Sequence, residues 1–210
     1  MILWGVGTSR TIRPHWALHE LDLTYDCRPI LPRSGETATD EFTALTARQK
    51  IPLLQDQDLI ITESAAIVTY LSDTYGKPHN RLIPEQSRDR ARCLEWCFFI
   101  ISELDATSLY VMRRHGDLAH VYGEAENANT AAAAYFQKQM RSVERILSDG
   151  RPHVLGHQFS AVDILLSTCV TWAIRYKIPV SDTVLHYNGE IMKRPSYAKA
   201  VARNTPAINS

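Results

Sequence analysis

The apolar positions change their spacing along the chain, and the opening part of the sequence mixes strand-like and helix-like patterns. Short apolar runs at Ile2–Val6 and Leu23–Ile30 predict two strands. Between them, Thr11–Leu21 carries apolar side chains at helical spacing, with Pro14 in the first turn, where a missing N–H costs little. Asp40–Ala47 predicts a short helix. The chain is therefore expected to begin with a strand–helix–strand unit followed by a helix.

A tight hairpin is predicted next. Pro52 opens an apolar run, residues 56–58 break it with polar side chains, and Leu59-Ile60-Ile61 resumes it. A proline is tolerated at the first residue of a strand, and the Ile51-Pro52 bond lies in a tight turn, where cis peptides usually occur. The helix Ala65–Tyr75 follows, and its first N–H groups carry partial positive charge that suits a carboxylate.

The remainder of the chain shows only helical spacing. Gly76 and Pro78 are typical of a helix end, so we expect a mixed domain at 1–78, a linker at 79–87 and an all-helical domain at 88–210. The helices expected in the second domain are Arg88–His115, Thr130–Leu147, Ser160–Tyr176, Val184–Met192 and Tyr197–Arg203.

The start of the strongly apolar helix Ser160–Tyr176 has a specific signature. Ser160 and Asp163 form a capping box in which Asp takes the role usual for Glu, and Phe159 and Ile164 stand at hydrophobic-staple positions. Such a cap contributes about 1 kcal/mol. We expect Ser160 and Asp163 to stabilise the fold rather than to act in catalysis.

The composition of the chain argues against several classes of binding partner. Lys+Arg and Asp+Glu balance at 23 each, which argues against nucleic acid, because that partner needs a basic face. No apolar run approaches a membrane span, and the N-terminus reads as a strand rather than a signal peptide. The four cysteines lack CxxC spacing and predict buried thiols in a reducing cytoplasm, with no metal site; they are Cys27, Cys93, Cys97 and Cys169.

Two neighbouring motifs carry a family resemblance. Lys50-Ile51-Pro52-Leu53-Leu54 followed by Glu63-Ser64-Ala65-Ala66-Ile67 resembles the glutathione-binding half of cytosolic glutathione transferases. The resemblance implies a thioredoxin-like α/β domain followed by a helical bundle. It also implies that the backbone of Ile51, beside Pro52, pairs with the cysteinyl part of glutathione, that Glu63 and Ser64 hold its γ-glutamyl end, and that Lys50 lies near its glycyl end. The alternative is a plain hairpin and a capped helix without a ligand.

The turn after the first strand holds the candidate for chemistry. Thr8 and Ser9 place hydroxyls where a helix begins, and capping alone would explain one of them. In serine-using, theta-like or bacterial members of the family, a serine lies in this turn four residues before an arginine, and Ser9 and Arg13 match that spacing. Ser9 is then the activating residue, Thr8 the reserve candidate, Arg13 structural, and Arg10 a neighbour of the thiol or the glycyl carboxylate.

The expected mechanism is thiol activation. A free thiol titrates near pH ~8.5, so little of it is thiolate at neutral pH. A hydroxyl that donates a hydrogen bond to sulfur favours the thiolate, and lowering the pKa by about two units is worth roughly 2.7 kcal/mol. A Ser-His-Asp arrangement with His15 or His19 is disfavoured, because no G-x-S-x-G sequence surrounds Ser9.

The resemblance further places the second substrate against the middle of the first long helix of the second domain. Tyr110 and Arg113 are expected to touch an electrophile, with Trp172 on the far wall or in the core. Asp105 and Ser108 interrupt an apolar stripe; they face a polar pocket, face a partner subunit or are satisfied internally.

The sequence thus predicts a glutathione transferase that uses glutathione as co-substrate against a small hydrophobic electrophile, as in detoxification. The resemblance also implies a homodimer. Two alternatives remain open: a binding or interaction module without transferase chemistry, and a glutathione-dependent isomerase, dehalogenase or peroxidase. The Ser-Ser-Cys turn of the maleylacetoacetate isomerase branch is absent here, which lowers the isomerase option.

Overall fold

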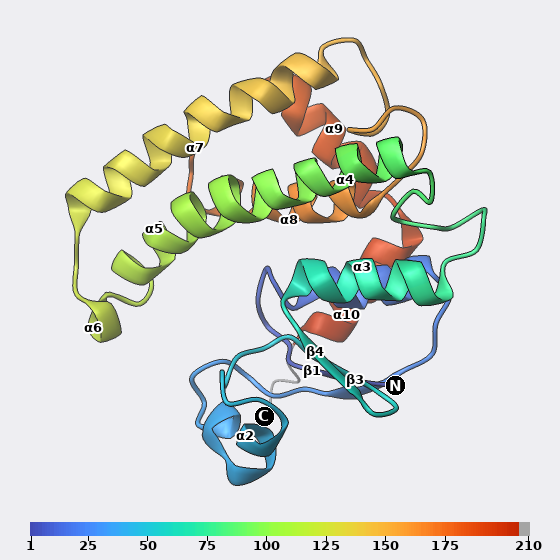
Figure 1. Ribbon diagram of the computed structural model, residues 1–210. Coiled ribbons are helices and arrows are strands. Elements are labelled where there is room, and N and C mark those ends of the chain that lie inside the picture. Colours follow the sequence, from blue (N-terminus) through green and yellow to red (C-terminus); the bar gives the residue numbers. More distant parts are fainter. Residues whose placement is uncertain (206–210) are drawn as a thin grey trace. The chain divides into compact units, whose positions relative to one another are not determined.

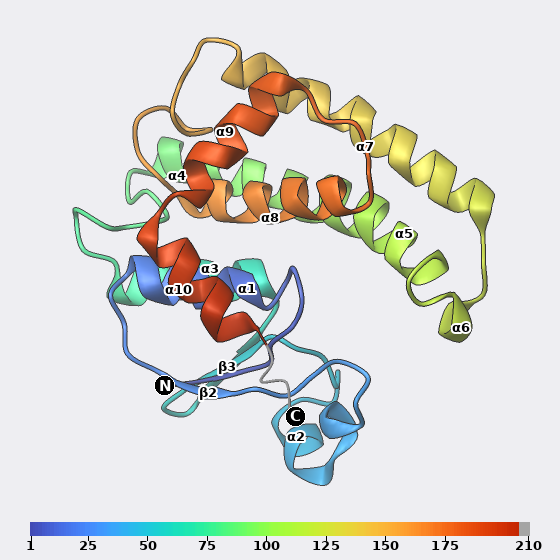
Figure 2. The ribbon, with the colours of Figure 1, turned by 180° about the vertical axis from the view of Figure 1, so that it is seen from behind.

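The computed structural model describes residues 1–205 and divides them into two compact units. The first unit contains Met1–Ile83 and residues 193–205, and the second unit contains Pro84–Met192. The predicted thioredoxin-like domain and helical domain are both present (Figures 1 and 2). The division differs from the expected helical domain at 88–210, because the last helix packs within the first unit.

The first unit is built on a four-stranded sheet in the order β2-β1-β3-β4. Strand β1 pairs parallel to β2 and antiparallel to β3, and β3 pairs antiparallel to β4. The sequence predicts each of these elements except η1, although the strands are shorter than expected. Their bounds are β1 Ile2–Trp4, α1 Ile12–Glu20, β2 Asp26–Arg28, η1 Glu36–Ala38, α2 Asp40–Leu45, β3 Leu53–Asp56, β4 Leu59–Thr62, α3 Ser64–Tyr75 and α10 Pro195–Asn204.

Alternation along β1 and β3 gives the sheet two apolar faces. Trp4 and Leu53 are register partners, and they pack with Phe42 of α2 in one buried cluster. Leu3 and Leu54 are also register partners and are fully buried on the opposite face, where α1 and α3 lie (Figure 1). Helices on both faces therefore exclude water from the strands whose ends support the candidate site.

Helix α10 is held against α1 by packing and charge. The Trp16 and Tyr197 rings lie 4.7 Å apart between centroids. The Arg194 guanidinium donates to both carboxylate oxygens of Glu20 at 2.7 Å, and the Ser196 hydroxyl donates to the same carboxylate. The Glu20 side chain is only 8% exposed, so this ion pair is largely shielded from water. These contacts explain why residues 193–205 belong to the first unit.

The second unit is helical throughout its regular elements. Its helices are α4 Ser87–Phe99, α5 Tyr110–His115, α6 Ala119–Tyr122, α7 Glu126–Leu147, α8 Ala161–Arg175 and α9 Asp182–Met192. A π-helical segment, Ile100–Leu109, joins α4 to α5, where the sequence predicts one uninterrupted helix. Within it, the Ser108 hydroxyl donates to the Glu103 carbonyl, five residues back, at 2.7 Å. Three- and four-residue apolar spacing does not reveal such a local widening.

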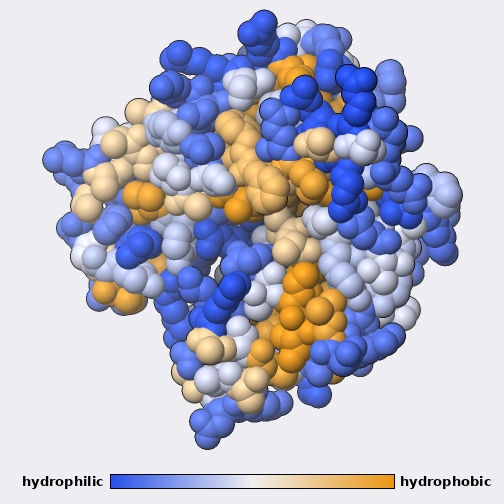
Figure 3. All heavy atoms as spheres, viewed as in Figure 1, coloured by the Kyte–Doolittle hydropathy of each residue, from blue (hydrophilic) through white to orange (hydrophobic). Residues whose placement is uncertain are grey.

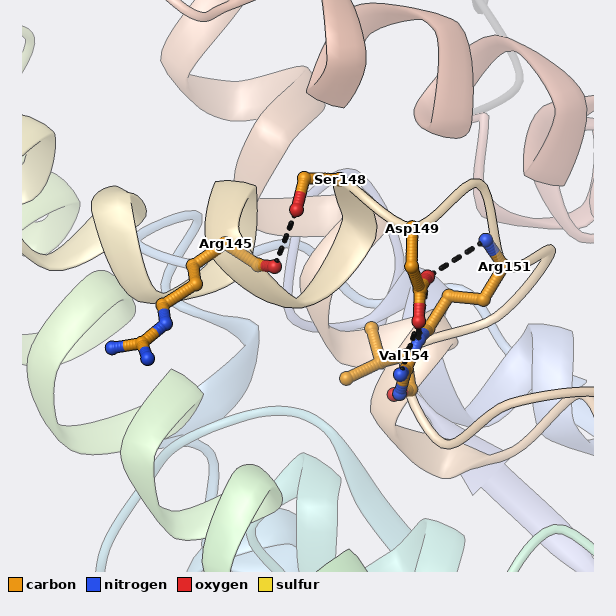
Figure 4. Close-up of polar contacts among 5 residues, drawn as sticks. All are labelled: Arg145, Ser148, Asp149, Arg151 and Val154. Atoms are coloured by element: carbon orange, nitrogen blue, oxygen red, sulfur yellow. Dashed lines mark hydrogen bonds and ion pairs between the residues drawn. The ribbon is translucent and has the colours of Figure 1, made fainter.

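Helix α8 is the core of the second unit, and the capping box at its start is confirmed. The Asp163 carboxylate accepts from the Ser160 N–H at 2.8 Å, from the Val154 N–H at 3.0 Å and from the Tyr187 hydroxyl at 2.6 Å. Burial raises the pKa of Asp163. The preceding loop is ordered by Arg151, which pairs with Asp149 and donates to the Val154 carbonyl at 3.3 Å (Figure 4). Ser160 and Asp163 therefore form the capping box that their spacing predicts.

None of the helices in residues 1–205 is long and apolar enough to cross a membrane. The same residues contain no cluster of three or more His, Cys, Asp or Glu side chains arranged to hold a metal ion.

Candidate functional site

The loop before β3 has the predicted cis peptide at Ile51-Pro52. Regular pairing of β3 begins at Leu53, after that bond. Among residues 1–205, the N–H and C=O of Ile51 make no backbone hydrogen bond. They are therefore available to the backbone of an extended ligand, as the resemblance implies.

Gly5 brings the first turn into direct contact with this loop. Its φ is +107°, and a Cβ added there would lie 2.5 Å from the Cβ of Ile51. Only glycine combines this conformation with this approach. The backbone of the turn that carries Ser9 is consequently packed, at Gly5, against the side chain of Ile51.

The Glu63-Ser64 pair opens α3 with an unusual backbone. Glu63 has φ +70° and ψ +115°, a sparsely populated conformation for a non-glycine residue that costs about 1–3 kcal/mol. Such strain is concentrated at binding sites, where the surrounding structure holds it. The Glu63 side chain is 70% exposed and lies 3.7 Å from Arg48, which also donates to the Thr62 hydroxyl. An exposed carboxylate that pairs with Arg48 thus lies beside the N-terminus of α3.

Ser64 is the first residue of α3 and is almost fully buried. The guanidinium of Arg13, a fully buried residue of α1, donates to its hydroxyl at 3.3 Å. Arg13 therefore joins α1 to the start of α3, a structural role that also places positive charge near the predicted carboxylate-binding position.

In the first turn, Thr8 acts as the cap. Its hydroxyl oxygen accepts from the N–H groups of Arg10 at 3.2 Å and Thr11 at 3.0 Å, and its own N–H donates to the Thr11 hydroxyl at 2.9 Å. Within residues 1–205, no hydrogen bond engages the hydroxyl of Ser9, which is half-buried. Capping accounts for Thr8, and it leaves the Ser9 hydroxyl available to a ligand.

His15 of α1 contacts the backbone of this turn at Gly5. Its Nε2 lies 3.2 Å from the Gly5 carbonyl, and its Nδ1 lies 2.7 Å from the Tyr25 hydroxyl. A carbonyl only accepts, so Nε2 carries the proton and Nδ1 accepts from Tyr25. Burial lowers the pKa of His15 to about 4, which keeps the ring neutral. Both ring nitrogens are occupied, so His15 is not placed as a base for Ser9.

The other predicted binding residues differ in exposure. Lys50 is exposed and Arg10 is half-buried, both in the first unit. Tyr110 and Arg113 are half-buried residues of α5, and Trp172 is 2% exposed on α8, all three in the second unit. Asp105 and Ser108 are buried, and the Ser108 hydroxyl is satisfied internally. The structure thus gathers Ser9, Ile51 and Ser64 in one unit and the electrophile candidates in the other.

Sequence reasoning missed Asn204, which binds the first turn from the end of α10. Its amide oxygen accepts from the Thr11 hydroxyl at 2.7 Å and from the Gly7 N–H at 3.2 Å, and its amide nitrogen donates to the Thr8 carbonyl at 3.2 Å. The partners are almost the whole chain apart, so no local pattern could reveal the contact.

The chain is similar to known proteins in sequence and in fold. The profile of the glutathione S-transferase N-terminal domain matches residues 1–73. A probable maleylacetoacetate isomerase of Vibrio cholerae is 28% identical over 98% of this chain and 97% of its own. The maleylacetoacetate isomerase of Mus musculus is 28% identical over 94% of this chain and 89% of its own.

Among solved structures, a glutathione transferase from Methylococcus capsulatus has a TM-score of 0.80 at 25% identity, covering 97% of this chain and 98% of its own. A maleylacetoacetate isomerase from Methylobacterium extorquens, with bound malonate and glutathione, shares the fold with a TM-score of 0.79 at 23% identity, covering 98% of both chains. The thioredoxin-like unit and the helical unit define the class of two-domain glutathione transferase folds. Residues 1–73 match the glutathione S-transferase N-terminal domain family, and the described residues have the two-domain fold of cytosolic glutathione transferases.

Proposed function

We propose that this protein binds glutathione in its first unit and is an enzyme that activates the glutathione thiol with the Ser9 hydroxyl. The observation that carries the proposal is the meeting of three features in that unit: an available Ser9 hydroxyl, the unpaired backbone of Ile51 before Pro52, and the strained Glu63-Ser64 start of α3. Ser64 and the α3 N-terminus bind the γ-glutamyl carboxylate, and Glu63 binds its amine. Lys50 and Arg10 are assigned to the glycyl carboxylate.

The chemistry follows from a hydrogen bond to sulfur. The Ser9 hydroxyl donates to the bound sulfur and stabilises the thiolate relative to the thiol. The N-terminal end of α1 contributes in the same direction. The thiolate then attacks an electrophilic carbon, and the second unit supplies Tyr110 and Arg113 for the electrophile. Trp172 is buried and is assigned to the wall behind them.

Two reactions are compatible with this thiolate, and the relatives favour one of them. In transfer, glutathione displaces a leaving group and is consumed. In isomerisation, the thiolate adds to a cis carbon–carbon double bond, the resulting single bond rotates, and loss of the thiolate restores glutathione beside the trans product. Several full-length relatives carry the name maleylacetoacetate isomerase, so we place the isomerase ahead of the transferase, although the Ser-Ser-Cys turn is absent.

The test has two stages. An ultraviolet titration of bound glutathione measures the thiol pKa, and a value about two units below that of free glutathione is expected. Turnover is then measured with maleylacetone, whose cis double bond lies between a carboxylate and a ketone, and with a chlorodinitrobenzene. Isomerisation without loss of glutathione supports the isomerase, whereas a consumed equivalent of glutathione per turnover supports the transferase. An unshifted thiol pKa would contradict enzymatic activation and favour a binding module.

We also propose that the protein is a homodimer. Phe98 on α4 is 69% exposed, and Leu59 and Ile60 on the edge strand β4 are 38% and 40% exposed. Figure 3 shows hydrophobic residues gathered on the face over the β3–β4 hairpin. A second copy of the chain would bury such side chains. Sedimentation of the wild type should give a dimer and that of Phe98→Asp a monomer, with an unchanged far-ultraviolet spectrum; a wild-type monomer would contradict the assignment.

A reducing, cytoplasmic location is part of the same proposal. All four cysteines are free thiols, and Cys93, Cys97 and Cys169 are buried. Such thiols persist where the compartment keeps them reduced.

A further inference from the structure

The end of α10 forms a clamp on the turn that carries Ser9. Besides the three amide contacts of Asn204, its backbone carbonyl accepts from the Gly7 N–H at 2.9 Å. Gly7, Thr8 and Thr11 are therefore all tied to one residue, and Ser9 lies within the clamped segment. Ser9 has no clamp contact of its own, so the position of its hydroxyl is set by the residues on either side.

The clamp also orders the hydroxyl protons of the turn. The Thr11 hydroxyl lies 2.7 Å from the Asn204 amide oxygen and 3.0 Å from the Thr8 carbonyl oxygen, which both only accept, so Thr11 is the donor in both contacts and the contact with Asn204 is the shorter. The Thr8 and Thr11 oxygens lie 3.0 Å apart, and with the Thr11 proton committed, Thr8 is the donor of that pair. The Thr8 hydroxyl thus donates its proton to Thr11, and its oxygen accepts from backbone N–H groups. Of the two neighbouring residues Thr8 and Ser9, it is therefore Ser9 whose hydroxyl can donate to a thiol.

The position of Asn204 is itself fixed. It is the last residue of α10, which packs along α1 through the Trp16–Tyr197 ring contact and the Glu20–Arg194 ion pair. Thr11, its shortest contact, is fully buried at the start of α1. The clamp therefore joins two packed helices across the turn and is not a contact between mobile loops.

We propose that Asn204 is a positioning residue for thiol activation: it holds the Gly7–Thr11 turn so that the Ser9 hydroxyl, and not that of Thr8, donates to glutathione sulfur. This inference rests on the proposed activation by Ser9. It predicts that loss of the Asn204 side chain changes the reactivity of the bound thiol more than the affinity for glutathione, because the Ile51 and Ser64 contacts lie outside the clamp.

The experiment compares purified full-length wild type, Asn204→Ala and Thr205→Ala. Thr205 is the matched control, since it is the next residue and its hydroxyl bonds back to the Val201 carbonyl rather than to the turn. We expect the pKa of the bound glutathione thiol to rise by about one unit in Asn204→Ala, roughly half of the proposed shift, while the dissociation constant for glutathione changes by less than about threefold. Thr205→Ala should match the wild type in both quantities.

A second variant approaches the same contact from the other helix and leaves α10 intact. Thr11→Val removes the hydroxyl that bonds Asn204, and Thr11→Ser keeps it. A raised thiol pKa in Thr11→Val that Thr11→Ser restores supports the clamp even if Asn204→Ala folds poorly. A lowered thiol pKa in the wild type that persists in both Asn204→Ala and Thr11→Val would overturn this inference alone. An unshifted pKa in the wild type would overturn the activation by Ser9 and the clamp's role in it.

Discussion

Ser9 and Thr8 are adjacent hydroxyl residues with different hydrogen-bonding states, and the difference can be measured. Thr8 has a structural role as the cap, whereas Ser9 is available to a ligand. Ser9→Ala should therefore raise the bound thiol pKa by about one to two units and lower kcat at least about tenfold, with a nearly constant dissociation constant for glutathione.

The control for Ser9→Ala is Thr8→Ser, which keeps the capping oxygen and should retain both the low thiol pKa and the turnover. Equal losses of affinity and turnover in Ser9→Ala would show that Ser9 shapes the site without activating the thiol. If the bound thiol kept its low wild-type pKa in Ser9→Ala and had a raised pKa in Thr8→Val, the activating residue would be Thr8 and not Ser9.

His15 makes the stability of the protein sensitive to acid. Burial lowers its pKa to about 4, and the neighbouring His19 is shifted in the same direction by partial burial and by Lys199 and Arg203. The unfolded chain binds a proton at His15 below about pH 6.5, whereas the folded protein does not until about pH 4. The contribution of His15 to the free energy of unfolding is thus fully present above about pH 6.5 and is lost as the pH falls toward 4.

Urea unfolding should therefore give a free energy of unfolding about 2 kcal/mol lower at pH 5 than at pH 7 from His15. His15→Gln should be less stable than the wild type at pH 7, because the Gly5 and Tyr25 contacts are disturbed, and its pH dependence should be shallower. An equally steep dependence in His15→Gln would assign the acid sensitivity to other groups.

At the scale of elements, the sequence predicts what depends on local chemistry. The Ile51-Pro52 turn, the hairpin and the Ser160–Asp163 capping box are each encoded within a few residues, and each is present. The π-helical segment is not encoded in this way, because one widened turn leaves the apolar spacing almost unchanged. The clamp by Asn204 and the Arg13–Ser64 contact need the tertiary fold, since they join residues far apart in the sequence.

The capping box gives an element-scale prediction that separates stability from activity. Asp163 is fully buried and satisfies the Ser160 N–H, the Val154 N–H and the Tyr187 hydroxyl. Asp163→Ala leaves these donors without an acceptor and should lower the free energy of unfolding by about 3 kcal/mol. Tyr187→Phe removes one donor and should cost about 1 kcal/mol. Turnover per folded molecule should be unchanged in both, and a lower thiol reactivity in Tyr187→Phe would contradict a purely structural role.

At the scale of the whole molecule, the chain returns to its first unit after completing the second. Residues 193–205 close the first unit through Arg194, Tyr197 and Asn204, which contact α1 and the first turn. The proposed glutathione site therefore depends on α10 as well as on Met1–Ile83. The sequence predicts the helix at 197–203 but not its place, because an amphipathic pattern does not say which surface it covers.

A chain that ends at Met192 should consequently lose more than a helix. Removal of α10 exposes Trp16 and leaves the nearly buried Glu20 carboxylate without Arg194, and an unpaired buried charge is costly.

Glutathione at about 100 times its dissociation constant should stabilise the wild type by about 2.7 kcal/mol, and it should not stabilise the truncated chain. The second unit, Pro84–Met192, retains its own core and should keep a cooperative thermal transition. The paired variant Glu20→Gln, with α10 in place, should still bind glutathione; glutathione binding by the truncated chain at wild-type affinity would show that the first unit forms its site without α10.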